Sequence, residues 1–334
     1  MSQWVAFHVT ERCGLNCIHC LREPGKHRAD LPLAVVEKVL GEAAALHGIR
    51  HVGFTGGDPL LWPHLEAAVD AAVSRGYTWH VVTSGKGFRR VVDMLDRAPA
   101  RRDGLRMLDF SLDGATEATH DAIRGEGSWR DAMSAIATCT AHQWPFSFQM
   151  TLHARNQSEL ESMGLLAGEL GAKTVSFAMM NATGRPEDRD LYLSPQAWDR
   201  IRDRIERFST LVKVDVSAAE GFRRGDRFHL CEPFRSEVLH VTPWGKLNLC
   251  CNLSGVAGGT DDVVADMATT SLADGHRKLF DLIHRLERER LEKIAAAPAA
   301  PGWDDFPCNR CLARFGKPHW VDGGSVGPRA VGWA

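Results

Sequence analysis

The sequence lacks any long apolar run. No stretch of about 18 consecutive apolar residues occurs in the chain, so we expect no transmembrane helix. Met1-Ser2-Gln3 leads directly into a strand-like segment, without the charged and then apolar pattern of a secretion signal. We therefore expect a cytosolic protein that is not bound to a membrane.

An excess of one charge is also missing. The chain of 334 residues has 40 basic and 42 acidic residues and a net charge of −2. Nucleic-acid-binding proteins usually carry a basic surplus and disordered partner arms an acidic block, so neither class is indicated. With 44% hydrophobic and 25% charged residues, the composition is that of an ordinary globular protein. The length allows one large domain and a smaller appendage.

Cysteine, in contrast, is plentiful, with nine residues. Disulfides are rare in the cytosol, so metal ligands or buried thiols are the expected use. Cys139 shares a predicted helix face with Ala132 and Ile136, and we expect it to be a buried thiol. The others gather near the two ends of the chain, as three at the start and five in the last third.

The N-terminal group, Cys13, Cys17 and Cys20, has the spacing C-x3-C-x2-C. Closed zinc and iron–sulfur sites normally take four protein ligands. Three thiolates on one short loop would leave one iron of a [4Fe–4S] cube open to another ligand. Because this spacing can arise by chance in a chain with many cysteines, its flanking motifs decide its meaning.

The first 180 residues alternate between strand-like and helix-like segments. We expect strands at 4–10, 51–55, 77–83, 106–112, 146–153 and 173–179. Helices are expected at 31–47, 61–75, about 87–97, from 128 onward and from 158 to 171. Six strand–helix steps predict parallel strands with right-handed crossovers, an α/β fold that fits a partial (β/α)6 TIM-like barrel. The loops at the carboxyl ends of such strands usually carry the site.

Helix-capping signals mark three of the predicted helix starts. Ser128 precedes Asp131, and Ser158 precedes Glu161, with the serine-then-acid spacing of a capping box. Ser194 is expected to cap a helix at 194–208. After this helix the alternation stops.

The last third reads differently from the barrel. Residues 237–250 are predicted to form a hairpin that turns at Pro243-Trp244-Gly245. A loop is expected at 254–262, a charged helix at about 274–297, and a Pro-rich linker at 297–302. We therefore expect a large domain at 1–210 and a smaller, cysteine-rich domain at 211–334.

Motifs at the predicted strand ends, together with the cysteine loop, resemble the radical S-adenosylmethionine (SAM) enzymes. Gly56-Gly57-Asp58-Pro59 ends the second strand, where that family shows Gly-Gly-Glu-Pro. Ser-Leu-Asp-Gly at 111–114 and His-Asp-x-x-Arg-Gly at 120–125 form a pair that the family often shows after the fourth strand. By this resemblance, residues 1–210 are the core barrel.

The resemblance implies a [4Fe–4S] cluster on the three N-terminal cysteines, with SAM chelating the open iron. An electron from the cluster would cleave SAM to methionine and a 5′-deoxyadenosyl radical, which abstracts a hydrogen atom from the substrate. The protein would bind, orient and shield these cofactors. A flavodoxin- or ferredoxin-type protein is the expected electron donor. The sequence indicates no catalytic acid or base.

The resemblance also implies a set of SAM-contacting residues, namely His19, Gly56, Gly57, Asp58, Ser84, Ser111 and Arg124. Glycines let backbone approach a ligand, and a guanidinium suits the SAM carboxylate as a two-pronged donor. The Asp58 side chain is one methylene shorter than the family's glutamate, which puts its direct contact in question. Turn and capping roles explain Asp113 and Asp121 as well as function does. Asn156 is expected to cap the next helix.

The later cysteines resemble the SPASM/Twitch extensions of the same family. Cys231, Gly245 and Cys250 form a C-x13-G-x4-C pattern, and Cys308 and Cys311 add C-x2-C. The resemblance implies one auxiliary [4Fe–4S] cluster closed by these four thiolates, in a Twitch-like module at 211–334. Cys251 is the neighbouring candidate, although the pattern favours Cys250. A zinc ion on the four cysteines is the alternative.

Radical modification of a peptide, by a cross-link, a thioether or an oxidation, is the favoured function. The barrel begins so near Met1 that a peptide substrate would need a separate recognition protein or be short enough to bind unaided. Radical SAM chemistry on a small molecule or a tetrapyrrole is one alternative. A non-catalytic zinc or iron scaffold is another, but Gly56-Gly57-Asp58-Pro59, Ser111 and Arg124 count against it, because a structural metal does not require them.

Overall fold

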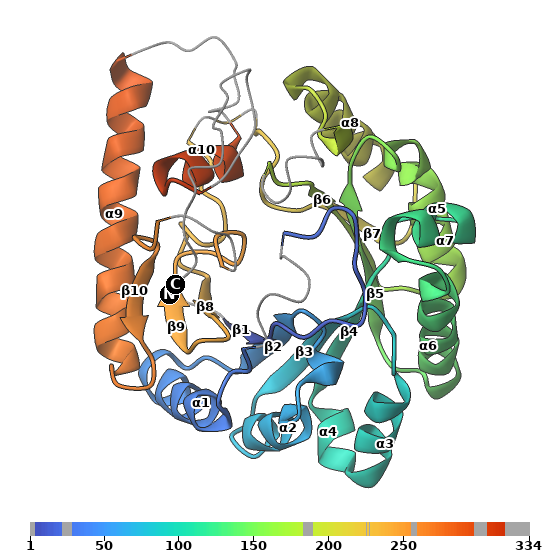
Figure 1. Ribbon diagram of the computed structural model, residues 1–334, viewed down its shortest axis with the longest axis horizontal. Helices are drawn as coiled ribbons and strands as arrows, with labels where there is room; N and C mark the ends of the chain where they lie inside the picture. The colour runs from blue at the N-terminus through green and yellow to red at the C-terminus, as the bar shows by residue number, and fades with distance from the viewer. Residues whose placement is uncertain are drawn as a thin grey trace.

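One curved sheet organises the protein. The computed structural model describes residues 4–21, 29–182, 190–224, 226, 228–254, 259–296 and 306–317. In these residues the strand order is β10-β9-β8-β1-β2-β3-β4-β5-β6-β7. Figure 1 looks into the arc formed by these strands, with helices along its outer side and α9 against β10 at one end.

The strands are β1 (Trp4–Thr10), β2 (His51–Gly56), β3 (Thr78–Thr83), β4 (Leu105–Ser111), β5 (Phe146–Leu152), β6 (Thr174–Met179), β7 (Asp215–Ala218), β8 (Val238–Val241), β9 (Lys246–Asn248) and β10 (Val263–Asp266). The helices are α1 (Leu33–His47), η1 (Pro59–Leu61), α2 (Leu65–Val73), α3 (Arg89–Arg97), α4 (Pro99–Asp103), α5 (Glu117–Arg124), α6 (Ser128–His142), η2 (Gln157–Glu159), α7 (Leu160–Leu170), α8 (Pro195–Ser209), α9 (Leu272–Ala296) and α10 (Pro307–Arg314).

The predicted parallel barrel is confirmed and is longer than predicted. Strands β1 to β6 pair in parallel, in sequence order. Residues beyond 210 extend the same sheet at both edges, because β7 pairs in parallel with β6 and β8 pairs in parallel with β1. The antiparallel hairpin of β8 and β9 is also confirmed, and Gly245 adopts φ +72° in its turn. The residues beyond 210 therefore extend the arc at both ends.

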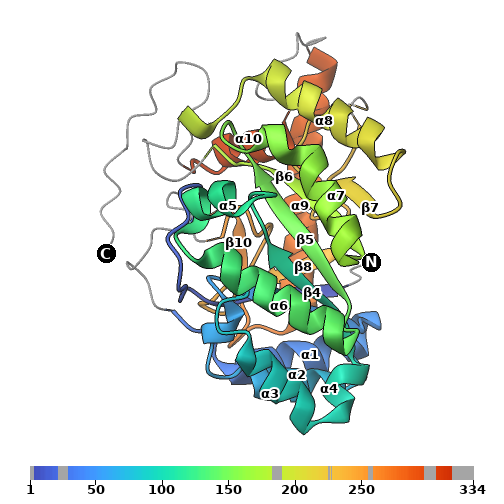
Figure 2. The ribbon, with the colours of Figure 1, turned by 90° about the vertical axis from the view of Figure 1, so that its right-hand side faces the viewer.

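Alternation along the strands separates an apolar face from a polar one. Val5, Phe7 and Val9 of β1 are fully buried in the same cluster as Val36 and Val39 of α1. Figure 2 shows α6 and α7 lying over the outer side of β4 to β6. Because successive side chains point to opposite faces, the remaining β1 residues line the other side of the sheet.

Both predicted capping boxes are wrong. Ser128 lies inside α6 and donates to Asp121 Oδ1 at 3.0 Å, and Asp121 also accepts the backbone N–H groups of Gly127 and Trp129 at 2.7 and 2.8 Å. The acid that caps α6 thus comes from the preceding helix α5, and the capping role that the sequence suggested for Asp121 is confirmed. The 3-10 turn η2 begins the α7 region, where no side chain caps the helix and Glu161 pairs with Arg204.

Three other sequence expectations are confirmed. The Ser194 hydroxyl accepts the Ala197 N–H at 3.3 Å and caps α8. Helix α9 spans nearly all of the predicted charged helix, and Cys139 is fully buried on α6. The predicted linker at 297–302 lies outside the described residues. Among the helices that are described, none combines the length and the apolar character that crossing a membrane requires.

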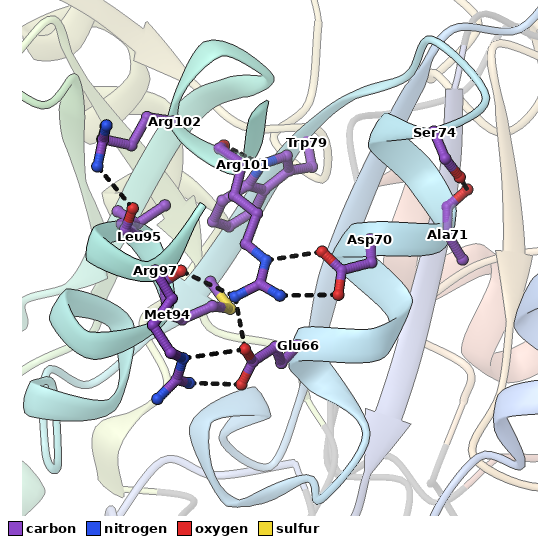
Figure 3. A network of polar contacts seen from close by, with 10 residues as sticks. All are labelled: Glu66, Asp70, Ala71, Ser74, Trp79, Met94, Leu95, Arg97, Arg101 and Arg102. Carbon is purple, nitrogen blue, oxygen red and sulfur yellow. Dashed lines mark hydrogen bonds and ion pairs between the residues drawn. The ribbon is translucent and has the colours of Figure 1, made fainter. Parts of the chain in front are cut away.

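The buried side chain of Arg101 links the outer helices to the sheet through ion pairs and hydrogen bonds (Figure 3). The Arg101 guanidinium pairs with both Asp70 carboxylate oxygens at 2.7 and 2.8 Å and with Glu66 at 2.5 Å. The Arg101 carbonyl accepts the indole N–H of Trp79 from β3. A bidentate guanidinium–carboxylate pair adds geometric specificity to the attraction. Helices α2 and α4 are thereby held in fixed positions on β3.

Imidazoles gather on the polar side of the sheet, around Trp4. The His51 and His80 rings share a hydrogen bond of 2.7 Å between Nε2 and Nδ1. The indole of Trp4 lies 5.2 Å from the ring of His80 and 6.5 Å from that of His240. His240 is 5% exposed, and neither ring nitrogen finds a hydrogen-bond partner among the described residues. Burial lowers the pKa of His240 to about 4, so this imidazole stays neutral near pH 7.

We predict that His240→Phe raises stability at pH 7 and flattens its dependence on pH. The unfolded chain protonates His240 near pH 6.5 and the folded chain only near 4, so the wild type loses stability as the pH falls through this window. Phe also removes two unpartnered nitrogens, each of which costs about 1–3 kcal/mol. Urea denaturation at pH 7 and pH 5 measures both effects, with His284→Phe at an exposed imidazole as the control. An unchanged pH dependence in His240→Phe would contradict the prediction.

Candidate cluster and cofactor site

The cysteine loop, residues 13–20, follows β1 and is held near its middle by hydrogen bonds. The Ile18 N–H donates to the Ile123 carbonyl of α5 at 3.0 Å, and the Cys20 N–H donates to the Cys17 carbonyl at 3.2 Å. Cys13 is exposed, Cys17 is buried and Cys20 lies between these extremes. Burial raises the pKa of Cys17 to about 11, although nearby Arg124 acts in the opposite direction. Metal binding at this loop would therefore release protons.

Gly56 and Gly57 are required by the cysteine loop itself. The Gly57 and Asp58 N–H groups donate to the carbonyls of Thr10 and Arg12, each at 2.7 Å. A Cβ atom at Gly57 would lie 2.2 Å from the Arg12 carbonyl oxygen, and one at Gly56 would lie 2.4 Å from that of Thr10. The glycines thus admit the backbone of this loop at the end of β2, so the close approach that their small size allows is made by the chain itself.

Asp58 joins the ends of β2 and β3. Its carboxylate is 3% exposed and accepts from the hydroxyls of Thr83 and Ser84, the latter at 2.7 Å. It also accepts the backbone N–H groups of Ser84 at 3.0 Å and Leu60 at 3.1 Å. An ionised carboxyl offers about four acceptor sites. The chain itself therefore fills the hydrogen-bonding capacity of Asp58.

Asp113 is the second buried carboxylate beside the loop. It is fully buried and accepts the Thr151 N–H of β5 at 2.8 Å. Its Oδ2 atom lies 2.5 Å from Arg124 Nε and 3.3 Å from His19 Nε2. Burial alone would raise the pKa of Asp113, but Arg124 and His19 hold it below its ordinary value. Asp113 thus connects two strands, a helix and the cysteine loop, which is more than a turn or capping role.

Arg124 faces the loop from the end of α5. Its side chain is 10% exposed, and Nη1 lies 3.9 Å from Cys17 Sγ, within the range of a weak hydrogen bond to sulfur. Ser111 ends β4 and is half-buried. The structure therefore places Arg124 near Cys17, and Asp58 and Ser84 together near the Arg12–Cys13 end of the loop. Contacts of these residues with SAM stay predictions.

Two buried histidines lie beside this network, and the sequence analysis gave neither of them a role of its own. His153 directly follows β5, and its ring lies 5.7 Å from that of His19. The Nδ1 atom of His120 accepts the backbone N–H of Asp113 at 3.3 Å. Burial lowers the pKa of both imidazoles to about 4. A polar residue directly after a parallel strand was the available signal for His153.

Asn156 does not cap the next helix, contrary to expectation. Its side-chain amide donates to the carbonyls of Asp113 and Thr151, both at 2.9 Å. Its oxygen accepts the His153 N–H at 2.8 Å. Asn156 is fully buried and braces the ends of β4 and β5 from within. Only the packed sheet brings these partners together.

The C-terminal cysteines form a second group. Cys308 and Cys311 are one turn apart on α10, Cys231 precedes β8, and Cys250 follows β9. Burial, together with the thiols of Cys311 and Cys231, holds the pKa of Cys308 far above its ordinary value. A hydrogen bond with Cys251, burial, and the thiols of Cys308 and Cys231 do the same for Cys250. The four predicted residues and Cys251 therefore share one neighbourhood.

Two further residues shape this second group. Asn252 donates from Nδ2 to Cys308 Sγ at 3.5 Å. Gly221 adopts φ +126°, and a Cβ atom there would lie 3.2 Å from the same sulfur. The sequence reasoning missed both, because they are far from Cys308 along the chain.

The donor chemistry of both groups suits iron–sulfur clusters. Soft thiolates are the usual ligands of such clusters, and none of the nine cysteines, all described, forms a disulfide. Among the described residues, no three His, Cys, Asp or Glu side chains form a group that would hold a single metal ion.

Comparison with known proteins points to one superfamily. The model of the radical SAM superfamily matches residues 7–167. The PqqA peptide cyclase of Gluconobacter oxydans is 32% identical over 256 residues, covering 72% of this chain and 68% of that protein. The AdoMet-dependent heme synthase of Methanosarcina barkeri is 28% identical over 220 residues, covering 64% of this chain and 60% of that protein.

The mycofactocin maturase MftC of Mycobacterium tuberculosis is 26% identical over 254 residues, covering 74% of this chain and 59% of that protein. The chain thus spans about three fifths of the length of the heme synthase and of the maturase.

Solved structures share the fold. The anSMEcpe structure with bound AdoMet has a TM-score of 0.67 at 12% identity and covers 92% of this chain and 85% of that chain. Streptococcus suis SuiB bound to its precursor peptide SuiA has a TM-score of 0.65 at 12% identity and covers 82% of this chain and 64% of that chain. Identities this low support likeness of fold alone.

We predict that Gly57→Ala displaces the cysteine loop and lowers both stability and iron content. The new methyl group meets a backbone oxygen that cannot rotate away, and such overpacking costs about 1–3 kcal/mol. The matched control is Gly41→Ala in α1, where a Cβ atom meets nothing within 4 Å and should be neutral or stabilising. Urea denaturation and iron analysis after anaerobic reconstitution measure the effects. Equal stability and equal iron in the two variants would refute the proposed role of Gly57.

Proposed function

The chain belongs to the radical SAM superfamily, and we propose that it modifies a peptide by radical chemistry. The observation that carries the proposal is the presence of two separate thiol groups in one chain, one of three residues after β1 and one of five in the C-terminal part. The peptide substrate is supported by the similarity to a peptide cyclase over about two thirds of both chains. We expect a cross-link, a thioether or an oxidation as the outcome.

Members of this superfamily use a [4Fe–4S] cluster and SAM. We propose that Cys13, Cys17 and Cys20 hold this cluster and leave one iron for SAM. When bound, the two cofactors supply one-electron cleavage of SAM and the abstraction of a hydrogen atom from the substrate. The loop suits this task because two hydrogen bonds to the glycine segment and one to α5 fix its backbone.

The predicted SAM contacts divide into direct and indirect ones. Because Thr83, Ser84 and Leu60 already occupy the Asp58 carboxylate, we propose that Asp58 acts by orienting Ser84 toward SAM. Arg124, His19 and Ser111 are proposed as direct contacts. Gly56 and Gly57 support the site through the loop that they admit. The buried His153 helps to exclude water beside His19.

Residues 211–334 are proposed as a Twitch-like module with one auxiliary [4Fe–4S] cluster. Cys231, Cys250, Cys308 and Cys311 are the proposed ligands, and Cys251 is the alternative to Cys250. Zinc is the alternative metal at this group. The auxiliary cluster would accept an electron from the substrate radical or lie close to the substrate.

The expected partners follow from the proposed chemistry. A flavodoxin- or ferredoxin-type protein would deliver the electron, and a separate protein would present the peptide if it does not bind unaided. A cytosolic location, expected from the lack of a long apolar run and of a secretion-signal pattern, also remains a prediction.

A tetrapyrrole is the second candidate substrate, because the heme synthase of Methanosarcina barkeri also resembles this chain. Reduced, reconstituted protein should be incubated with SAM and either a tetrapyrrole or short peptides encoded beside its gene. A change of mass in the peptide together with 5′-deoxyadenosine supports the peptide assignment. A modified tetrapyrrole and unchanged peptides would refute it. Zinc-rich, colourless protein that does not cleave SAM would identify a metal-binding scaffold.

We predict that replacing Cys13, Cys17 and Cys20 together with Ala abolishes SAM cleavage. Without these thiolates no iron is available to chelate SAM, while the second group still binds about four of the roughly eight irons expected for two cubes. Chromatographic detection of 5′-deoxyadenosine after reduction measures the loss. Cys139→Ala, at a buried thiol outside both groups, is the control. Continued 5′-deoxyadenosine formation in the triple variant would defeat the assignment.

Cys308→Ala should remove the auxiliary cluster and retain some SAM cleavage. We expect the iron content to fall by about four atoms, because a closed cube needs all four thiolates. Parallel iron analysis of Cys250→Ala and Cys251→Ala identifies the fourth ligand, since only the true ligand should reproduce this loss. Unchanged iron in Cys308→Ala would show that the grouping is wrong.

A further inference from the structure

We propose that the buried ion pair of Asp113 and Arg124 sets the reduction potential of the N-terminal cluster, with the two charges acting on it in opposite directions. This inference rests on the proposed function, because it concerns the cluster assigned to the cysteine loop. The guanidinium of Arg124 lies between the two groups, with Nε 2.5 Å from Asp113 Oδ2 and Nη1 3.9 Å from Cys17 Sγ. The cysteine sulfur thus faces a cation that is paired, through another of its nitrogens, with a buried carboxylate.

Both charges are shielded from water. The Asp113 side chain is fully buried and that of Arg124 is 10% exposed. Charges act more strongly on one another in such surroundings than at a solvated surface. The potentials of iron–sulfur clusters respond to nearby charge and to hydrogen bonds on their sulfur atoms. Arg124 provides Cys17 with both a nearby positive charge and a weak hydrogen bond to its sulfur.

The carboxylate is held in place independently of Arg124. The Thr151 N–H of β5 donates to Asp113 Oδ1, and the Asn156 amide donates to the Asp113 carbonyl. Nε2 of His19, from the cysteine loop, lies 3.3 Å from Oδ2. Because the ends of two strands fix Asp113, Asp113 in turn fixes where the guanidinium sits. The direction of the pair, cation toward the sulfur and anion away from it, is therefore built into the fold.

This arrangement predicts a sign for each charge. Reduction adds one electron to the cluster, so a nearby cation favours the reduced form and a nearby anion opposes it. Asp113→Asn removes the anion but keeps an oxygen that can accept from Arg124 Nε, so it should raise the potential, whereas Arg124→Gln removes the cation and should lower it. The double variant Asp113→Asn/Arg124→Gln removes both charges and should return close to the wild type. A merely structural pair would not give opposite shifts that cancel.

The test is a redox titration of the full-length, reconstituted protein, followed by electron paramagnetic resonance. The N-terminal cluster is identified as the signal that changes when SAM is added. We expect each single variant to change the equilibrium of reduction at least tenfold, which is about 59 mV for a one-electron couple. Glu161→Gln and Arg204→Gln, which split an ion pair between α7 and α8, are the matched controls and should leave the potential unchanged.

Shifts of the same sign in the two single variants, or no shift, would overturn the proposal. Loss of the cluster from either single variant would also count against it, because a pair that only adjusts the potential is not required for assembly. Failure of the proposed function looks different, since wild-type protein would then show no SAM-responsive signal. A wild type that titrates normally beside unshifted variants refutes the role of Asp113 and Arg124 alone.

Discussion

Two buried carboxylates flank the cysteine loop, and the architecture of the site depends on how they are satisfied. A buried charge is costly unless it is paired or hydrogen-bonded. Asp58 meets this requirement with hydroxyl and backbone donors at the ends of β2 and β3. Asp113 meets it with Arg124, His19 and the Thr151 N–H. Each acid can be buried only when several segments that are distant in the sequence pack against it. The site therefore forms only together with the fold.

The sheet brings these distant segments into contact. Parallel strands bring their carboxyl ends to one edge, and short motifs after β1, β2, β3, β4 and β5 are collected there. The absence of side chains at Gly56 and Gly57 lets the cysteine loop lie directly against the end of β2. The C-terminal residues then extend the sheet through β7 and β8, so the second thiol group is continuous with the barrel. One scaffold thus carries both groups of thiols.

Much of the fold was predictable because its signals are local. The strands β1 to β6, the hairpin turn at Gly245 and the span of α9 follow from apolar periodicity and from turn residues. The missed elements are short, such as α4 and α5, or pair with distant partners, such as β7. The capping boxes failed for a related reason. A nearby acid or serine predicts a cap, but the competing donors and acceptors of the folded chain decide where each side chain binds.

The sequence by itself determined the spacing of the thiols, the order of the strands and the positions of glycine, since these depend on residues close together in the chain. Only the tertiary structure decided that Asp113 is a hub, that Asn156 braces two strands, and that Gly221 makes room for Cys308. These roles depend on which distant groups meet in a water-poor environment. Burial and pairing at such meetings are properties of the packed chain, and no local pattern encodes them.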